Sequence, residues 1–395
     1  MFKTIPDSSL SGLLSHIDTL LETYLSSKFW IWNIIILCLA LSFFHMILSN
    51  PSTLWAYNQF WKSVGAGREF DAYLIIKKQA STFYQDLGFS HFSVNKYEST
   101  GHIHKMRFRL FLPFLVATFH IKHIGLTIFI AQLLLSVAFL WLSTKFTERI
   151  LRNRINTFLF MLSFSLLYPT RSAWLDVTAY GDFFAYFFLL LSIYVNRPLS
   201  IYICLQIAFW IDERALVNSI YILSWYILTA YYDAKRYQFT KPQLVVILSV
   251  LTYIIFRYYL SHSIQHPLIE KPYWSEFLST YYENIKVIGF RLWSGYLGNW
   301  FLIILAITLL LYERRYKLAI FFSGILLLTL NLSFVVYDVN RAISYGYVSI
   351  FIAICILRRS LNAIELRRLL LFVFVYMILS PLPNRLRLPG GYTIM

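Results

Sequence analysis

The chain has 395 residues, of which 58% are hydrophobic and only 14% are charged, and its mean hydropathy is +0.60. This composition excludes an ordinary water-soluble domain of this length and indicates a protein whose main solvent is lipid. The net charge of +16 does not indicate a nucleic-acid-binding protein, because the basic residues stand in short clusters between apolar runs.

The apolar runs approach or exceed the roughly 20 residues needed to cross the hydrocarbon of a bilayer. Backbone in lipid must form its hydrogen bonds internally, so each run predicts a helix. The expected fold is an all-α polytopic membrane protein of about 11 transmembrane helices, with residues 1–395 in a single membrane domain. The expected spans are 29–48, 124–144, 156–170, 179–195, 199–211, 215–231, 243–260, 299–312, 318–336, 342–357 and 368–381.

Positive charge is concentrated in four connections, 145–154, 235–241, 314–317 and 358–368. The positive-inside rule places all four in the cytoplasm, and they fall at alternating connections, as a single threading requires. This threading predicts a cytoplasmic N-terminus (1–28), a long first outer loop (50–122) and a second large outer loop (261–299). The first loop is itself basic, but long loops are translocated largely regardless of charge.

The first outer loop is expected to contain amphipathic helices. Residues 70–87 carry apolar side chains at mixed spacings of three and four among polar ones, which is typical of helices lying on a membrane surface. Residues 109–120 are apolar behind a basic lead and are expected at the interface or partly inserted.

Acidic residues number only 19, and many of them map to the outer side with arginines nearby. Ionisable residues at membrane depth are costly and indicate a functional cavity by default. The sequence therefore predicts one wet site assembled from several outer turns. The acidic residues are Glu69, Asp71, Asp86, Asp176, Asp182, Asp212, Glu213 and Asp338, and the arginines are Arg109, Arg171, Arg214 and Arg341.

Glu69 and Asp71 are two residues apart and follow Arg68. Two carboxylates at this spacing could supply a general base or hard oxygen ligands for a divalent cation. A solvated turn before a surface helix is the alternative, and on the spacing alone it is the commoner one.

Two later turns combine acids with an arginine. Asp212, Glu213 and Arg214 interrupt two apolar helices that are joined without a Gly or Pro loop. Asp338 precedes Arg341 by three residues in a similar turn, where an arginine could bind a phosphate through two hydrogen bonds. A structural ion pair within a tight helical hairpin explains the 212–214 pattern equally well.

Other chemistry finds little support in the sequence. His102 and His104 could be two metal ligands, but no third ligand follows at a recognisable spacing, so surface histidines are favoured. The chain has no G-x-S-x-G, Walker A, H-E-x-x-H or C-x-x-C pattern, which removes the usual support for a hydrolase, an ATPase or a zinc protease. Cys38, Cys204 and Cys355 lie inside apolar runs and are expected to be packing residues.

With this topology the chain resembles the GT-C superfamily of membrane glycosyltransferases, which use polyprenyl-phosphate-linked sugars. Those enzymes have a long first outer loop with a modified D-x-D motif, and Glu69-Phe70-Asp71 is similar to its E-x-D form. The segment from Arg107 through Arg109 to Pro113 looks like the R-x-L-x-P entry to the second span in bacterial members.

The resemblance implies sugar transfer to a glycan or lipid-linked acceptor at the outer membrane face. Asp71 would take the proton from the acceptor hydroxyl, and the arginines would neutralise the departing lipid phosphate. No cofactor is required, a divalent cation is optional, and no nucleic acid takes part. The candidate catalytic residues are Asp71 and Glu69, and the candidate substrate-binding residues are Arg109, Asp212, Glu213, Arg214, Asp338 and Arg341.

Two other functions remain open. A polysaccharide polymerase or ligase would share the lipid-linked donor but use the later outer loop, with Arg291 as its candidate residue. A transporter or flippase is less favoured, because the charges gather at one face and no inverted repeat is visible. The bacterial cytoplasmic membrane is the expected location.

Overall fold

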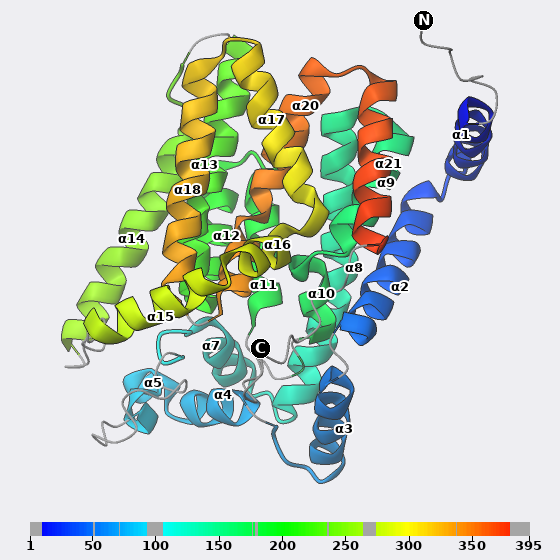
Figure 1. The fold of residues 1–395 in the computed structure, drawn as a ribbon. Coiled ribbons are helices and arrows are strands. Elements are labelled where there is room, and N and C mark those ends of the chain that lie inside the picture. Colours follow the sequence, from blue (N-terminus) through cyan, green and yellow to red (C-terminus); the bar gives the residue numbers. More distant parts are fainter. Residues whose placement is uncertain are drawn as a thin grey trace, which may run out of the picture.

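The computed structural model describes residues 10–49, 52–70, 72–92, 106–175, 177, 181–234, 237–263, 274–336 and 338–379. Every regular element in these ranges is a helix, as expected for an all-α fold (Figure 1). The helices of the N-terminal half are α1 (Leu10–Ser26), α2 (Trp30–Ser49), α3 (Ser52–Gly65), α4 (Ala72–Ser81), α5 (Phe83–Asp86), the 3-10 helix η1 (Phe89–Phe92), α7 (Phe111–Phe119), α8 (Ile124–Leu151), α9 (Arg154–Ser165), α10 (Tyr168–Leu175) and α11 (Asp182–Tyr194). Those of the C-terminal half are α12 (Pro198–Ile211), α13 (Glu213–Ala234), α14 (Lys241–Ser263), α15 (Trp274–Lys286), α16 (Ile288–Tyr296), η2 (Leu297–Asn299), α17 (Trp300–Tyr312), α18 (Tyr316–Phe334), α19 (Val339–Ser344), η3 (Tyr345–Tyr347), α20 (Val348–Ser360) and α21 (Ala363–Leu379).

Six helices in the described part of the chain are long and apolar enough to cross a membrane. Other apolar helices are shorter: α11 has 13 residues and α12 has 14, which at 1.5 Å per residue gives about 20 Å of helix against a hydrocarbon layer of about 30 Å. The architecture fits an integral membrane protein, but the expected count of about 11 spans is not confirmed. The six are Trp30–Leu48, Ile124–Leu151, Lys241–Ser263, Ile288–Tyr312, Tyr316–Phe334 and Val339–Ser360.

The helix bundle has a basic end, where contacts join the basic connections to one another. Arg358 donates from Nε to the carbonyl oxygen of Leu151 over 3.1 Å, which brings the end of α20 to the end of α8. The guanidinium of Arg359 lies 3.8 Å from the ring centroid of Tyr232 in α13, and that of Arg315 lies 5.8 Å from the same centroid. Connections that alternate along the sequence therefore meet at one end of the bundle.

The opposite end, which we call the loop end, carries α3, α4, α5 and α7 (Figure 1). Helix α4 is amphipathic, as the pattern of residues 70–87 predicts. Ala72, Tyr73 and Ile76 are buried on one side, while Lys77 and Lys78 are exposed on the other. The buried side packs against α7 and α8, so α4 covers the bundle with its apolar side.

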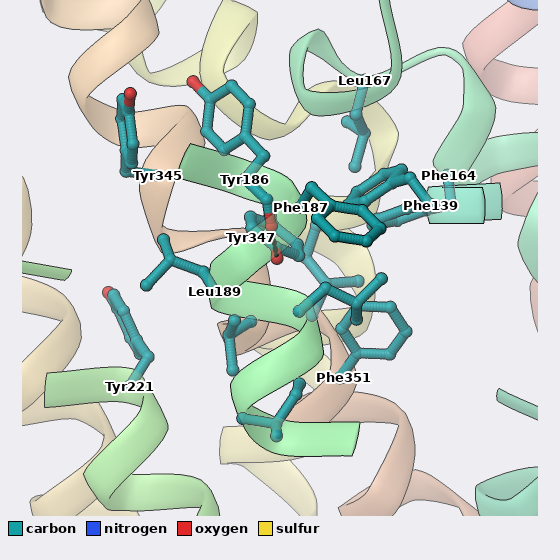
Figure 2. Close-up of a cluster of buried hydrophobic side chains, with 14 of the residues drawn as sticks. Phe139, Phe164, Leu167, Tyr186, Phe187, Leu189, Tyr221, Tyr345, Tyr347 and Phe351 are labelled. Carbon is teal, nitrogen blue, oxygen red and sulfur yellow. Dashed lines mark hydrogen bonds between the residues drawn. The ribbon is translucent and has the colours of Figure 1, made fainter. Parts of the chain in front are cut away.

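Aromatic side chains fill the centre of the bundle (Figure 2). The ring of Phe164 stacks on that of Phe139, with centroids 6.0 Å apart, and is tilted against that of Phe351, with centroids 5.2 Å apart. The Tyr347 hydroxyl donates to the Tyr186 carbonyl over 2.8 Å, so this buried phenol is satisfied. The three cysteines are also buried and form no disulfide within the described residues, in agreement with the expected packing role.

Close approach of two helices beside this core depends on a glycine. At Gly295 in α16, an added Cβ would lie 2.3 Å from Cγ2 of Ile343 in α19. Real Cβ atoms do not approach other heavy atoms so closely, so a larger residue would push the two helices apart. At Gly289, on the same helix, an added Cβ would meet nothing within 4 Å.

We expect Gly295→Ala to lower the free energy of unfolding by about 1–3 kcal/mol, because it overpacks the contact between α16 and α19. Gly289→Ala is the matched control and should be neutral or stabilising by up to about 1 kcal/mol, since alanine has the higher helix propensity. Unfolding by SDS in mixed micelles measures both. Equal effects of the two substitutions would contradict the packing assigned to Gly295.

Candidate functional site

A single residue, Asp212, joins α12 to α13. Its backbone is extended, with φ −153° and ψ 125°, and its carbonyl oxygen accepts a hydrogen bond from the N–H of Ala215 at 3.0 Å. Its side-chain Oδ1 accepts from the N–H of Arg214 at 2.9 Å. Aspartate suits this position because its short side chain can satisfy a free N–H at the start of a helix. The joint forms the tight hairpin that the 212–214 pattern predicts and fixes the Asp212 carboxylate.

Two arginines bind this carboxylate. Arg214 donates from Nε to Oδ1 at 2.9 Å and from Nη2 to Oδ2 at 2.6 Å, which is a bidentate pair. Arg109, two residues before α7, reaches the same Oδ2 from Nη2 at 2.9 Å. The first loop is thus tied by an ion pair to the α12–α13 joint.

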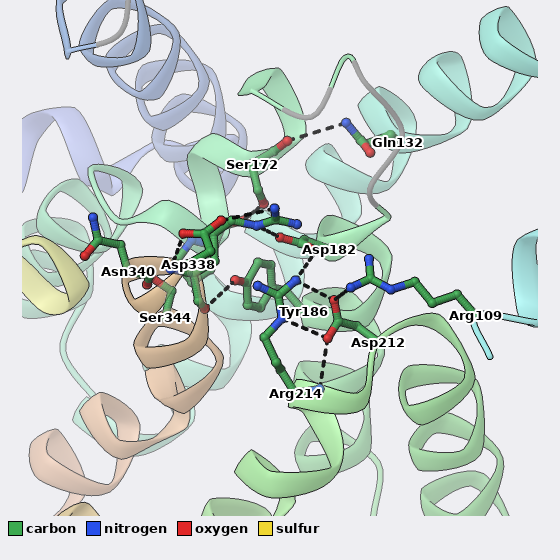
Figure 3. Close-up of polar contacts among 12 residues, drawn as sticks. Arg109, Gln132, Ser172, Asp182, Tyr186, Asp212, Arg214, Asp338, Asn340 and Ser344 are labelled. Atoms are coloured by element: carbon green, nitrogen blue, oxygen red, sulfur yellow. Dashed lines mark hydrogen bonds and ion pairs between the residues drawn. The ribbon is translucent and has the colours of Figure 1, made fainter. Parts of the chain in front are cut away.

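A second buried carboxylate, Asp182 at the first position of α11, binds Arg214 and Arg341. Arg214 Nη2 donates to Oδ1 at 3.0 Å, and Arg341 Nε donates to Oδ2 (Figure 3). Arg214 therefore bridges the two carboxylates. We call Arg109, Asp182, Asp212, Arg214 and Arg341 the ion cluster.

The ion cluster combines deep burial with an incomplete charge balance. The side chains of Asp182 and Asp212 are 0% exposed and those of the three arginines 11–13%. Three positive charges thus face two fully buried negative ones. Two further acids lie at the rim of the ion cluster, with side chains 38% (Glu213) and 42% (Asp338) exposed. Oε2 of Glu213 lies 4.0 Å from Nε of Arg109, and Oδ2 of Asp338 lies 3.1 Å from Nη1 of Arg341.

Tyrosines form one wall of the ion cluster. Tyr186 lies one helical turn after Asp182, and its hydroxyl donates to the carbonyl oxygen of Arg341 at 3.4 Å. The guanidinium of Arg214 lies 5.2 Å from the ring centroid of Tyr345, and the rings of Tyr186 and Tyr345 are 4.4 Å apart. These rings exclude water, and the lower local dielectric strengthens each ion pair.

The ion pairs control protonation. Burial alone would raise the pKa of the Asp212 carboxyl, but Arg109 and Arg214 hold it well below its ordinary value. Burial alone would lower the pKa of the Arg109 guanidinium, but Asp212 and Glu213 raise it above its ordinary value. Asp212, Arg109 and Arg214 therefore stay ionised at neutral pH, so Asp212 is a poor proton acceptor and serves to hold the arginines.

The carboxylate of Glu69 binds the start of α8. Its Oε1 accepts from the N–H of Ile124 at 3.1 Å and its Oε2 from the N–H of Gly125 at 2.9 Å, so Glu69 caps the first turn of α8. Negative charge is favourable there because the N–H groups of the first turn have no partner within the helix. In the described part of the chain Glu69 makes no ion pair. Asp71 lies outside the described residues.

A divalent cation finds no ligand set within the described ranges, where no three His, Cys, Asp or Glu side chains come together. His102 and His104 lie outside these ranges, as does Asp71. The optional cation beside Asp71 stays a prediction.

The structure therefore brings together the six predicted substrate-binding residues around Asp182, which the sequence places on the outer side without assigning it a role. The sequence does contain a signal for it. Asp182 follows Gly181, whose φ of +78° favours glycine, and it stands directly before the apolar run of α11. An acid at the first position of an apolar helix is favourable even without a ligand, so the pattern alone does not identify a site.

A small cavity of about 10 Å³ lies beside Arg109. Its walls include Ile76 of α4, Leu112 of α7 and Ile211 of α12. It has room for about one water molecule. In this conformation the space next to Arg109 is closed by α4 and α7.

Comparisons with protein-family models, curated proteins and solved structures found no match to this chain.

Removing one buried carboxylate should destabilise the fold strongly. Asp182→Asn leaves Arg214 and Arg341 with one partner fewer, and we expect the free energy of unfolding to fall by about 3–5 kcal/mol. Asp338→Asn is the control: it weakens an ion pair to the same Arg341 at the exposed rim and should cost less than about 1 kcal/mol. SDS unfolding of the two variants measures the difference. A small effect of Asp182→Asn would show that the cluster contributes little to stability.

The low pKa of Asp212 predicts where stability depends on pH. A carboxylate whose pKa is lower in the folded than in the unfolded chain stabilises the folded state at any pH above its pKa in the unfolded chain, about 3.9. This contribution is lost as the pH falls through the pKa of the folded state. The stability difference between the native chain and Asp212→Asn should therefore be constant from about pH 5 to 8 and should shrink only below about pH 4. An inflection near neutral pH would contradict the assignment.

Proposed function

We propose that this chain is a membrane glycosyltransferase of the GT-C type, which moves a sugar from a polyprenyl-phosphate-linked donor to a glycan or lipid-linked acceptor. The main support is the convergence of Arg109, Arg214 and Arg341 from three separate connections on one buried site. Such a site is suited to neutralise the phosphate that departs with the lipid, because this is where negative charge builds up during transfer.

The proposed orientation follows from the two ends of the bundle. Arginines and lysines at the basic end favour a cytoplasmic position, which puts the N-terminus inside and the loop end at the outer face. The location would be the bacterial cytoplasmic membrane, with about 11 crossings, some of them by short helices that require a locally thin bilayer.

In the proposed reaction the bond between the anomeric carbon and the lipid phosphate breaks, and the acceptor oxygen forms a new bond to that carbon. The acceptor proton passes to a carboxylate, and Asp71 is our candidate because it lies in the same loop as Arg109. Glu69 has both carboxylate oxygens bound to α8 and supports this loop instead. Asp182 and Asp212 orient the arginines.

The cavity beside Arg109 is too small for a sugar ring, so donor binding requires α4 or α7 to move.

One observation favours the polymerase or ligase as a second candidate. Arg291 is buried on α16, which packs against α19, the helix that carries Arg341. A lipid-linked glycan that reached the ion cluster from the second large loop would pass this arginine.

Transfer of radiolabelled sugar from membranes charged with polyprenyl-phosphate sugar tests the proposal. We expect Asp71→Asn to slow transfer at least about 100-fold through loss of the base, and Arg109→Gln to slow it about 100- to 1000-fold through loss of charge neutralisation. Glu283→Gln and Lys77→Gln, at exposed positions away from the cluster, are the controls and should retain transfer.

Three results would overturn this assignment. Full transfer by Asp71→Asn together with loss in Arg291→Gln would move the chemistry to the second large loop, as in a polymerase or ligase. Movement of a lipid-linked sugar across proteoliposomes without covalent transfer would identify a transporter. Equal losses in the control variants would show that the charges act only through folding.

A further inference from the structure

A shallow, open pocket of about 320 Å³ lies at the basic end of the bundle. Three elements line it: the last turns of α1, the turn between α8 and α9, and the start of α21. Its charged lining consists of Arg152, Arg154, Arg367 and Glu22. Three cations from two distant parts of the sequence thus share one pocket with a single carboxylate.

The three arginines keep donors that have no partner among the described residues. Arg154 donates from Nη1 to the carbonyl oxygen of Leu25 at 3.0 Å, and its side chain forms no ion pair within the described residues. Arg367 binds Asp18 through Nη1 at 2.5 Å, and its buried Nε has no hydrogen-bond partner within the described residues. Arg152 is exposed and makes no ion pair in the described part of the chain.

Arg152 stands at a backbone position that usually holds glycine. Arg152 ends α8 in the left-handed conformation, with φ +52° and ψ 29°. Glycine is the usual residue at such a position, and another residue there costs roughly 1 kcal/mol or more of backbone strain. An arginine is nevertheless present, and its side chain lines the pocket.

The surroundings place the pocket at the level of lipid head groups. The guanidinium of Arg154 lies 5.1 Å from the ring centroid of Trp30, at the start of the membrane-length helix α2. The ammonium group of Lys28 lies 4.9 Å from the ring centroid of Phe29. The preceding helix, α1, exposes the apolar side chains of Leu20 and Tyr24. Aromatic residues flanked by cations are typical of the membrane interface.

We propose that this pocket binds the phosphate of an anionic phospholipid. Planar guanidinium groups match phosphate oxygens through paired hydrogen bonds, and basic pockets between membrane helices suit anionic head groups. The net positive lining favours an anionic head group over a zwitterionic one, and Glu22 can accept a hydrogen bond from a head-group hydroxyl. The proposal does not depend on sugar transfer, because it concerns the other end of the bundle.

Thermal unfolding of the detergent-purified chain, with native mass spectrometry of the same samples, tests this site. The probes are phosphatidylglycerol, phosphatidylcholine and inorganic phosphate. We expect phosphatidylglycerol to raise the unfolding temperature and to remain bound, while the other two have little effect. Arg152→Gln should weaken phosphatidylglycerol binding about fivefold, and Arg152→Gln with Arg154→Gln about 25-fold, if each arginine contributes the interaction typical of a basic residue at an anionic surface.

Arg197→Gln is the matched control, because it removes an exposed arginine from the turn between α11 and α12, outside the pocket lining. It should leave phosphatidylglycerol binding unchanged. An equal loss in Arg197→Gln would show that binding is a general charge effect and would overturn the proposal. If inorganic phosphate raised the unfolding temperature as much as phosphatidylglycerol, and the pocket substitutions abolished this rise, the ligand would be free phosphate and the lipid proposal would be overturned. No effect of the pocket substitutions on phosphatidylglycerol binding would place the lipid elsewhere.

Discussion

The burial of two carboxylates constrains how the helices meet at the loop end. Transfer of Asp182 and Asp212 out of water costs several kcal/mol each, and only well-placed arginines offset this cost. The arginines come from the segment before α7, from the start of α13 and from α19. These segments and the start of α11 must therefore converge, so their arrangement follows from the ion pairs as much as from apolar packing.

The two ends of the bundle use arginine in different ways. At the loop end each arginine of the ion cluster is bound to a carboxylate, so an incoming anion must compete with Asp182 or Asp212 for its partners. At the basic end several arginines lie over aromatic rings or bind carbonyl oxygens. Of the three arginines that line the pocket, only Arg367 is paired with a carboxylate, that of Asp18, within the described residues. The first arrangement suits a group whose charge appears during a reaction, and the second suits a ligand that is always charged.

Local patterns in the sequence predicted local structure well. The 212–214 turn and the amphipathic α4 follow from composition and spacing within a few residues. The pairing of Asp182 with Arg341 spans 159 residues, and no local pattern encodes it. For Glu69 a local motif exists but does not predict the contact that the side chain makes. The E-x-D spacing indicates a catalytic role, whereas the carboxylate caps a helix that begins 55 residues later. The number of membrane crossings is also uncertain from hydropathy, since short apolar helices such as α11 can be buried in protein instead of spanning lipid.

The sequence positions of the ion cluster imply an order of assembly during synthesis. Asp182, Asp212, Arg214 and Arg109 all belong to the first 214 residues, and Arg214 reaches Asp182 across only 32 positions. Domains and subunits of a nascent chain form from the N-terminus onward, so this part can pair early. Arg341 emerges from the ribosome more than 120 residues later, and Asp182 holds a single arginine until then. The intermediate helices α14 to α18 must therefore insert around a site whose charges are only partly paired, and the arrival of α19 completes it.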